Sequence, residues 1–272
     1  MIAWRVDGSR PTAPQAVEVP VIGPPSAEEF RTYVDRTTPV VIRGATEAWP
    51  ARTRWSPAEL RRHYGDRVLR AARSRNQDVV YGPNEGIPCD DVTVAEYVDR
   101  LQSRGPVEHY LLAVLEEQIP ELLQDIALPG FCPRPPWLMT RFWMSPAGMG
   151  SPLHFDVPQN LFAQVIGRKQ VLLYPPRDVV NLYPLPPFSR LPHYSRVDAE
   201  RPDVERFPRL RRTRPMRAVV DAGDLLFIPR LWWHQVRALE FSISVNFWWA
   251  EGLVYHAVRL AKIFQRLRGL RL

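Results

Sequence analysis

From residue 137 to residue 248 the chain is built of short apolar or alternating runs, each bounded by glycine, proline or aspartate. Runs of this length, repeated at this spacing, are typical of the strands of a β-sandwich or barrel. The pattern predicts strands at 138–144, 161–165, 170–174, 218–220, 225–228, 233–238 and 241–248. We therefore expect a mainly β fold in which residues 137–250 form the barrel.

The first 136 residues predict mixed α and β additions in front of this barrel. Three capping-box patterns, in which a hydroxyl residue is followed three positions later by a glutamate, mark the starts of short helices. Residues 38–44 are a β-branched run that ends in glycine, and they predict a buried strand. The capping pairs are Ser26 with Glu29, Ser56 with Glu59, and Thr93 with Glu96.

Two further segments depart from the strand pattern. Residues 181–215 are rich in proline and charge, which favours a long insertion between barrel strands. Residues 251–272 place apolar side chains at helical spacing with arginines between them. We expect a C-terminal amphipathic helix that packs on the barrel or on a second copy, and hence a homodimer. The whole chain, 1–272, is predicted to be a single domain.

Composition narrows the function classes. Hydrophobic residues make up 45% and charged residues 24% of the 272 positions, which is ordinary for a globular protein and argues against disorder. Apolar runs stay well short of the roughly 18 to 20 residues that a membrane-spanning helix needs, and residues 1–15 lack a signal-peptide pattern. A cytoplasmic location is the resulting expectation. Cys89 and Cys132 have no paired spacing, so neither a disulfide framework nor a zinc knuckle is indicated.

The net charge of +7 is compatible with an acidic partner. The arginines are nevertheless spread along the chain instead of gathered in one block, so nucleic acid is not the favoured partner. Lysine occurs only at positions 169 and 262. Because the chain uses arginine nearly everywhere else, each of these two lysines calls for an explanation.

His154 and Asp156 are the first candidate metal ligands. Side chains two apart in a strand point to the same face and can grip one ion together. His234 follows 78 residues after Asp156 (234 − 156), a separation that only a folded barrel could close. Two histidines and one carboxylate form the facial triad of non-haem Fe(II) oxygenases. A His-x-Asp sequence alone is weak evidence, since a hydrogen-bonded surface histidine fits it as well.

Lys169 strengthens the oxygenase interpretation. It lies in the predicted strand after the turn at 166–168 and shares a face with Val171 and Leu173. A lysine at a hairpin edge usually reaches solvent, but an ammonium group on an apolar face needs an anion. A compact charge on a flexible stem suits a single carboxylate in a narrow cavity, such as the distal carboxylate of 2-oxoglutarate.

The chain resembles the JmjC and cupin-8 hydroxylases. The resemblance rests on residues 150–156 (GSPLHFD), 160–176 (NLFAQVIGRKQVLLYPP), 223–234 (GDLLFIPRLWWH) and 244–248 (SVNFW), and the front strand with Trp49 and Pro50 extends it over nearly the whole chain. Within that family the pattern is most similar to the asparaginyl hydroxylases that act on hypoxia-inducible factor, including residues 202–208. The resemblance implies a double-stranded β-helix, also called a jelly roll or cupin fold, and Fe(II), 2-oxoglutarate and dioxygen as the cofactor set.

Matching positions imply roles for individual residues. Iron ligands are expected at His154, Asp156 and His234, and Lys169 is expected to pair with the distal carboxylate of 2-oxoglutarate. Polar positions that line the cosubstrate pocket are Ser151, Tyr110, Asn160 and Asn246, although turn, core or capping roles would also suit the first three. Asn246 lies on a face that alternation makes polar, together with residues 242 and 244.

Substrate contacts are expected at Trp248, which matches a position near the substrate entrance, and in the insertion. Where the asparaginyl hydroxylases grip the target amide with a glutamine, this chain has Tyr194, preceded by His193. These two residues are the candidates for substrate selection, and the departure puts an asparagine target in doubt.

The predicted activity is hydroxylation of a side-chain carbon, the β-carbon for preference, of an amino-acid residue in a protein or peptide, a peptide natural product included. Three alternatives stay open: hydroxylation of a tRNA base, hydroxylation of a small molecule, and a cupin-fold binding protein without catalysis.

Overall fold

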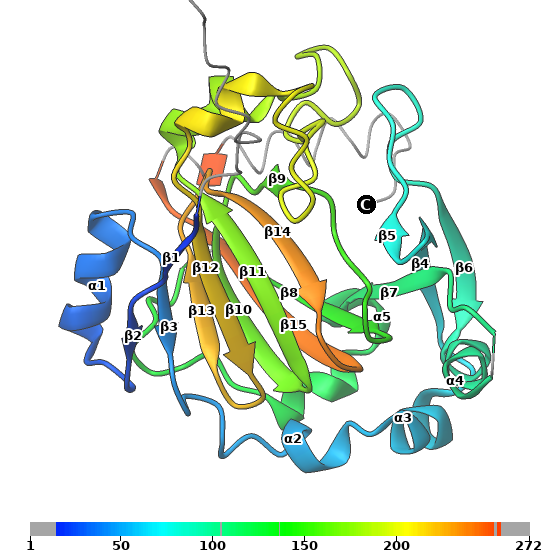
Figure 1. The fold of residues 1–272 in the computed structure, drawn as a ribbon. Helices are drawn as coiled ribbons and strands as arrows, with labels where there is room; N and C mark the ends of the chain where they lie inside the picture. The colour runs from blue at the N-terminus through cyan, green and yellow to red at the C-terminus, as the bar shows by residue number, and fades with distance from the viewer. Residues whose placement is uncertain (1–14, 104, 136, 253–254, 257–272) are drawn as a thin grey trace, which may run out of the picture.

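The computed structural model describes residues 15–103, 105–135, 137–252, 255 and 256. Over this range the chain forms two β-sheets that face each other, with helices along the outer side of the larger one (Figure 1). The mainly β jelly-roll prediction is confirmed.

The smaller sheet has the strand order β1-β12-β11-β14-β9. Its strands are β1 (Val17–Glu18), β12 (Met216–Asp221), β11 (Arg168–Tyr174), β14 (Trp233–Ala238) and β9 (His154–Phe155). The order β2-β3-β13-β10-β15-β8-β7-β4-β5 runs through the larger sheet, and β6 pairs with β4 beside this path. Its strands are β2 (Val21–Ile22), β3 (Val40–Ile42), β13 (Leu225–Ile228), β10 (Gln159–Ile166), β15 (Ser242–Ala250), β8 (Trp137–Ser145), β7 (His109–Val114), β4 (Val68–Arg75), β5 (Asp78–Val79) and β6 (Cys89–Thr93).

Apolar side chains fill the space between the two sheets because side chains alternate faces along each strand. Val171 and Leu173 of β11 pack in one buried cluster with Phe162 of β10 and Leu226 of β13. A larger cluster lies on the other side of the larger sheet, where helices cover it. The barrel is thus packed at its lower part, and polar residues on the inner face are left for the site.

Helices begin at all three predicted capping positions. They are α1 (Ala27–Asp35), α3 (Pro57–Tyr64) and α4 (Val94–Gln102), each preceded by a hydroxyl side chain that accepts a hydrogen bond from the backbone N–H three residues on. Only at Thr93 does the glutamate return the bond to the cap, so the full capping box exists there alone among the three. The shorter helices are α2 (Ala51–Arg54), α5 (Leu115–Gln118) and the 3-10 turns η1 (Pro120–Asp125), η2 (Pro176–Leu182) and η3 (Pro208–Arg212).

The insertion is more ordered than its proline content suggested. Val197, Val204 and Phe207 are buried in a cluster with Leu153 and Trp233 of the barrel. Residues 181–215 therefore form a packed cover over one end of the barrel, seen as the looped segment above β14 in Figure 1.

Two expectations meet the limits of the described residues. The predicted C-terminal helix, residues 251–272, lies outside them except for 251, 252, 255 and 256, so the helix and the dimer built on it stay predictions. Within the described part of the chain, no helix is both long enough and apolar enough to cross a membrane.

Candidate active site

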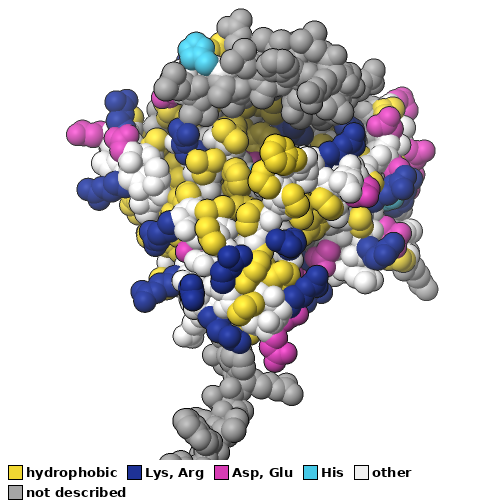
Figure 2. Space-filling model, turned by 90° about the horizontal axis from the view of Figure 1, so that it is seen from above, with side chains coloured by type: hydrophobic (Ala, Val, Ile, Leu, Met, Phe, Trp, Pro, Cys, Tyr) yellow, Lys and Arg dark blue, Asp and Glu magenta, His cyan; other side chains and the backbone are white. Residues whose placement is uncertain are grey.

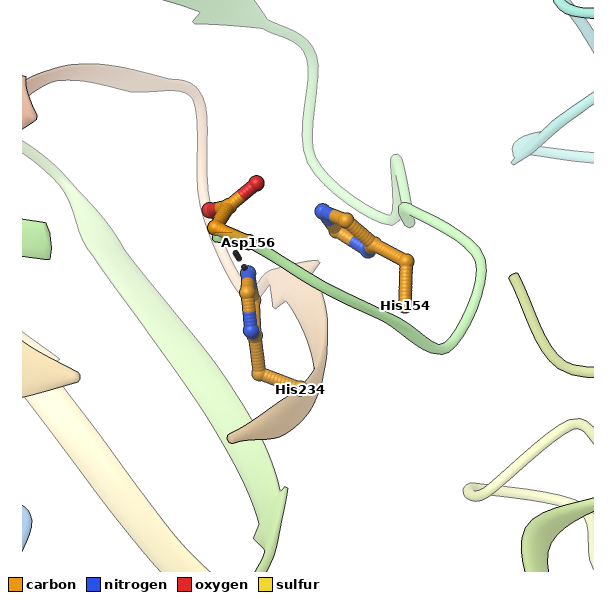
Figure 3. A group of neighbouring side chains, drawn as sticks. All are labelled: His154, Asp156 and His234. Atoms are coloured by element: carbon orange, nitrogen blue, oxygen red, sulfur yellow. Dashed lines mark ion pairs between the residues drawn. The ribbon is translucent and has the colours of Figure 1, made fainter. Parts of the chain in front are cut away.

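The three predicted metal ligands meet at one end of the barrel (Figure 3). His154 of β9 lies directly opposite His234 of the antiparallel strand β14, and Asp156 follows just beyond the end of β9. One ligand atom of each residue lies within 4.8 Å of the others, and Nε2 of His234 is 3.6 Å from Oδ2 of Asp156. Strand pairing, with a β9 of only two residues, is thus what closes the 78-residue gap in sequence.

The imidazole rings are held with one nitrogen free for a metal. Nδ1 of His154 lies 2.8 Å from the carbonyl oxygen of Pro152, and Nδ1 of His234 lies 3.0 Å from that of Trp232. When Nδ1–H donates to these carbonyls, Nε2 carries the free lone pair. Burial, and then the neighbouring His154, lower the pKa of His234 to about 4, so its ring is neutral near pH 7. Two neutral imidazoles and a carboxylate are a donor set that fits Fe(II).

A pair of buried asparagines supports the carboxylate. Asn246 Nδ2 donates to Asn160 Oδ1 at 2.8 Å, and Asn160 Nδ2 donates to Oδ2 of Asp156 at 3.3 Å. Asn160 is on β10 and Asn246 on the adjacent strand β15. Such outer partners fix the orientation of a metal-binding carboxylate.

Lys169 is fully buried on β11, with 0% of its surface exposed. Its ammonium group donates to the hydroxyl of Tyr110 at 2.9 Å and to that of Ser244 at 2.8 Å. Burial lowers the pKa of Lys169 to about 7. Because both partners are neutral, the charged form of Lys169 has no counter-ion among the described residues, and a carboxylate ligand would provide one.

The remaining predicted pocket residues border the same cavity as the triad. Its walls include Tyr110, Ser151, Asn160, Asn246 and Trp248. The hydroxyl of Ser151 accepts a hydrogen bond from the backbone N–H of Val236 at 3.1 Å, which also ties the turn before β9 to β14. The structure therefore brings together the residues that the resemblance assigned to the metal and to the cosubstrate.

The insertion contributes two aromatic side chains beside the triad. The ring of Tyr194 is stacked on His154, with centroids 5.1 Å apart and planes 19° apart. His193 packs edge-on against Tyr194, and burial followed by the charge of His154 lowers the pKa of His193 to about 4. Both residues thus lie where they can orient a metal ligand, whereas their role in substrate selection stays a prediction.

Sequence reasoning missed two polar residues of this region. Ser244 holds Lys169, and the alternation of residues 242, 244 and 246 was the signal that could have identified it. Arg141 lies inside a predicted strand, on β8, yet it is 91% buried. A charged residue in the middle of a barrel strand was visible in the sequence, but its burial depends on the fold.

Comparisons with known proteins agree with this architecture. A family described as "Cupin-like domain" matches residues 25–253. The chain is 34% identical to Lysine-specific demethylase 8 of Xenopus tropicalis, over 88% of this chain and 54% of that protein, and 37% identical to its namesake in Danio rerio, over 89% and 61%. It is 30% identical to tRNA wybutosine-synthesizing protein 5 of Gallus gallus, over 86% and 77%. The chain thus spans less than two thirds of the two demethylases.

Proposed function

The chain belongs to the cupin-like JmjC family, and from this premise we propose that it is an Fe(II)- and 2-oxoglutarate-dependent dioxygenase. Its proposed reaction is hydroxylation of a side-chain carbon, the β-carbon for preference, of an amino-acid residue in a protein or peptide. The observation that carries the proposal is the pairing of a His-Asp-His triad with a buried lysine below the same cavity. A structural barrel has no physical need for either group.

Each residue then has a defined task. His154, Asp156 and His234 would hold the metal, and Lys169 would bind the distal carboxylate of the cosubstrate. When bound, iron and 2-oxoglutarate supply the oxidising chemistry, in which dioxygen, the cosubstrate and a C–H bond become succinate, carbon dioxide and C–OH. Asn160 keeps the carboxylate of Asp156 oriented, and the buried rings around Lys169 keep bulk water from its ammonium group.

Hydroxylation of a modified tRNA base is the second candidate, because one relative is named as a tRNA wybutosine-synthesizing protein. The two candidates differ in their dependence on salt. Binding to tRNA through phosphates weakens linearly on a plot of log affinity against log salt concentration. A peptide substrate would not compete with tRNA and would lack this steep dependence.

The proposal is tested by anaerobic titration of the apoprotein with Fe(II) and 2-oxoglutarate. Chelation of the cosubstrate at a facial triad is expected to give a weak absorption band near about 500 nm. The variant His234→Ala is expected to lose the band and the formation of succinate in air. His63→Ala, which removes an exposed histidine of α3, is the matched control and should retain both. Survival of the band and of succinate formation in His234→Ala would show that the ligand assignment is wrong.

A further inference from the structure

Arg141 lies on the inner face of the barrel, beside the residues that border the site. It is directly opposite Asn246 in the β8–β15 pair, and directly opposite residues share one face of a sheet. Only 9% of its surface is exposed. The carbon at the centre of its guanidinium group lies 5.2 Å from the centroid of the Trp248 ring. Since Trp248 borders the cavity, the guanidinium group lies at the cavity's rim.

This arginine has no ion-pair partner among the residues that the structure describes. Its buried Nε makes no hydrogen bond, and the buried Nε1 of Trp248 beside it makes none either. Desolvation by burial lowers the pKa of Arg141, and the charge of Asp156 is the largest effect that opposes this. In the proposed function Asp156 is committed to the metal. Two neighbouring buried donors therefore lack an acceptor, an arrangement that is costly unless a ligand supplies one.

The cosubstrate is an unlikely source of that acceptor on grounds of length. Lys169 and Ser244 mark the deep end of the cavity, and Ser244, Asn246 and Trp248 follow one another along one face of β15. With a rise of about 3.3 Å per residue, Trp248 lies about 13 Å along the strand from Ser244. A five-carbon dicarboxylate that is anchored on Lys169 and chelates the metal is too short to reach the far end of that row.

We propose that Arg141 and Trp248 form a receiving site for a carboxylate of the primary substrate, an inference that rests on the proposed function. A guanidinium group binds a carboxylate through two parallel hydrogen bonds, and the indole N–H adds a third donor. The proposed enzyme thereby selects a residue that carries, or directly adjoins, a carboxylate. Arg141 would fix that carboxylate while the carbon to be oxidised faces the metal.

The charge around the site fits an anionic substrate. The insertion, residues 181–215, contains eight arginines and four acidic residues, and its Tyr194 stacks on a triad histidine. Figure 2 shows this end of the molecule, with Lys and Arg side chains around a group of hydrophobic ones. Such a positive surround raises the encounter rate of a negatively charged substrate.

The test measures binding without turnover. The protein is loaded anaerobically with Mn(II) and 2-oxoglutarate and titrated with two matched pairs of blocked amino acids: the N-acetyl methylamides of aspartate and asparagine, and of glutamate and glutamine. Binding is followed by tryptophan fluorescence. At least one acidic probe is expected to bind about tenfold more tightly than its neutral partner. Arg141→Gln should reduce this preference to less than about twofold while leaving the affinity for 2-oxoglutarate unchanged.

Two further variants sharpen the test. Arg206→Gln removes an exposed arginine that also stacks on an aromatic ring, Phe207, and it should keep the full preference. Arg141→Lys keeps the buried charge but lacks the planar fork, so it should keep a reduced preference, and it serves if the glutamine variant does not fold.

The outcomes separate the inference from the function on which it rests. Equal binding of the acidic and neutral probes by the wild-type protein would overturn the inference alone. A tenfold loss of 2-oxoglutarate affinity in Arg141→Gln, with the probe preference intact, would overturn it by assigning the guanidinium group to the cosubstrate. Tighter binding of AMP than of either acidic probe would overturn it in favour of a phosphate. Failure of the wild-type protein to bind Mn(II) and 2-oxoglutarate would overturn the proposed function as well.

Discussion

Lys169 shows how a single buried residue can connect binding to pH. Its ammonium group is held by two neutral hydroxyls, and burial lowers its pKa to about 7. Near neutral pH a substantial fraction of the free protein therefore carries an uncharged lysine. An anionic cosubstrate binds the charged form, so the protein must take up a proton before or during binding when the pH is above this pKa.

The affinity for 2-oxoglutarate is accordingly expected to fall as pH rises. Both carboxylates of the ligand stay ionised over the range, so the change comes from Lys169, and the dissociation constant should increase by about tenfold between pH 6 and pH 8. Anaerobic titrations with Mn(II) at a series of pH values measure it. The metal affinity, measured without cosubstrate, is the control. A dissociation constant that does not change over this range would contradict a depressed pKa for Lys169.

At the residue scale the sequence was most informative where chemistry requires a motif. The His-x-Asp pair, the distant histidine and the solitary lysine were all recognisable, and the structure places them around one cavity. Ser244 and Arg141 were not recognised, because nothing local distinguishes a serine that holds a lysine, or an unpaired arginine, from ordinary strand residues. Only the pairing of β15 with its neighbours reveals them.

At the scale of elements, the turn between β10 and β11 is set by Gly167. Its φ is +73°, a left-handed conformation, and a Cβ there would lie 1.9 Å from the carbonyl oxygen of Phe241. The turn leads directly into the strand that carries Lys169. Both the conformation and the close approach therefore require glycine.

The variant Gly167→Ala is expected to lower the free energy of unfolding by about 3 kcal/mol or more, because the backbone must shift to relieve the contact. Gly130→Ala is the matched control, since a Cβ at that position meets no atom within 4 Å. It should change stability by less than about 0.5 kcal/mol. Chemical denaturation of both variants provides the comparison, and equal stabilities would refute the steric argument.

Barrel strands and capped helices were predictable because their signals are local. All seven predicted barrel strands exist, and the three caps begin helices. The strands β4 and β7 of the front third were not predicted. Alanine, arginine and serine in β4 have weak strand preference, and the apolar run in β7 is too short to tell strand from helix. Pairing of β7 with β8 settles the matter, and that contact is not encoded nearby.

On the scale of the whole molecule, a network of charges joins three parts of the chain. Arg237 of β14 pairs with Asp78 of β5 at 2.7 Å and with Glu200 of the insertion at 2.5 Å. Arg201 of the insertion also pairs with Asp78. Asp78 thus ties the front third to the barrel and to the cover over the site. Because the side chain of Arg237 is only 15% exposed, its pairs are less screened than surface pairs.

The variant Asp78→Asn is expected to loosen the insertion. The predicted effect is a loss of about 1 kcal/mol of local stability, seen as faster hydrogen exchange at the amide of Leu185, which bonds to Tyr194 within the insertion. Glu59→Gln, which breaks the exposed pair with Arg62 on α3, is the control and should leave that amide unaffected. Unchanged exchange in Asp78→Asn would mean that apolar packing alone holds the insertion in place.

The two-residue strand β9 forms the free edge of the smaller sheet and is bonded there to β14 alone. In chain-entropy terms, an ion shared by Asp156 and His234 is a reversible cross-link that closes a loop of 78 residues, the difference between their positions. Metal loading then resists heat as well as preparing the site for chemistry. The proposed enzyme would melt at a higher temperature with its metal than without it, and the edge at β9 would gain the most protection.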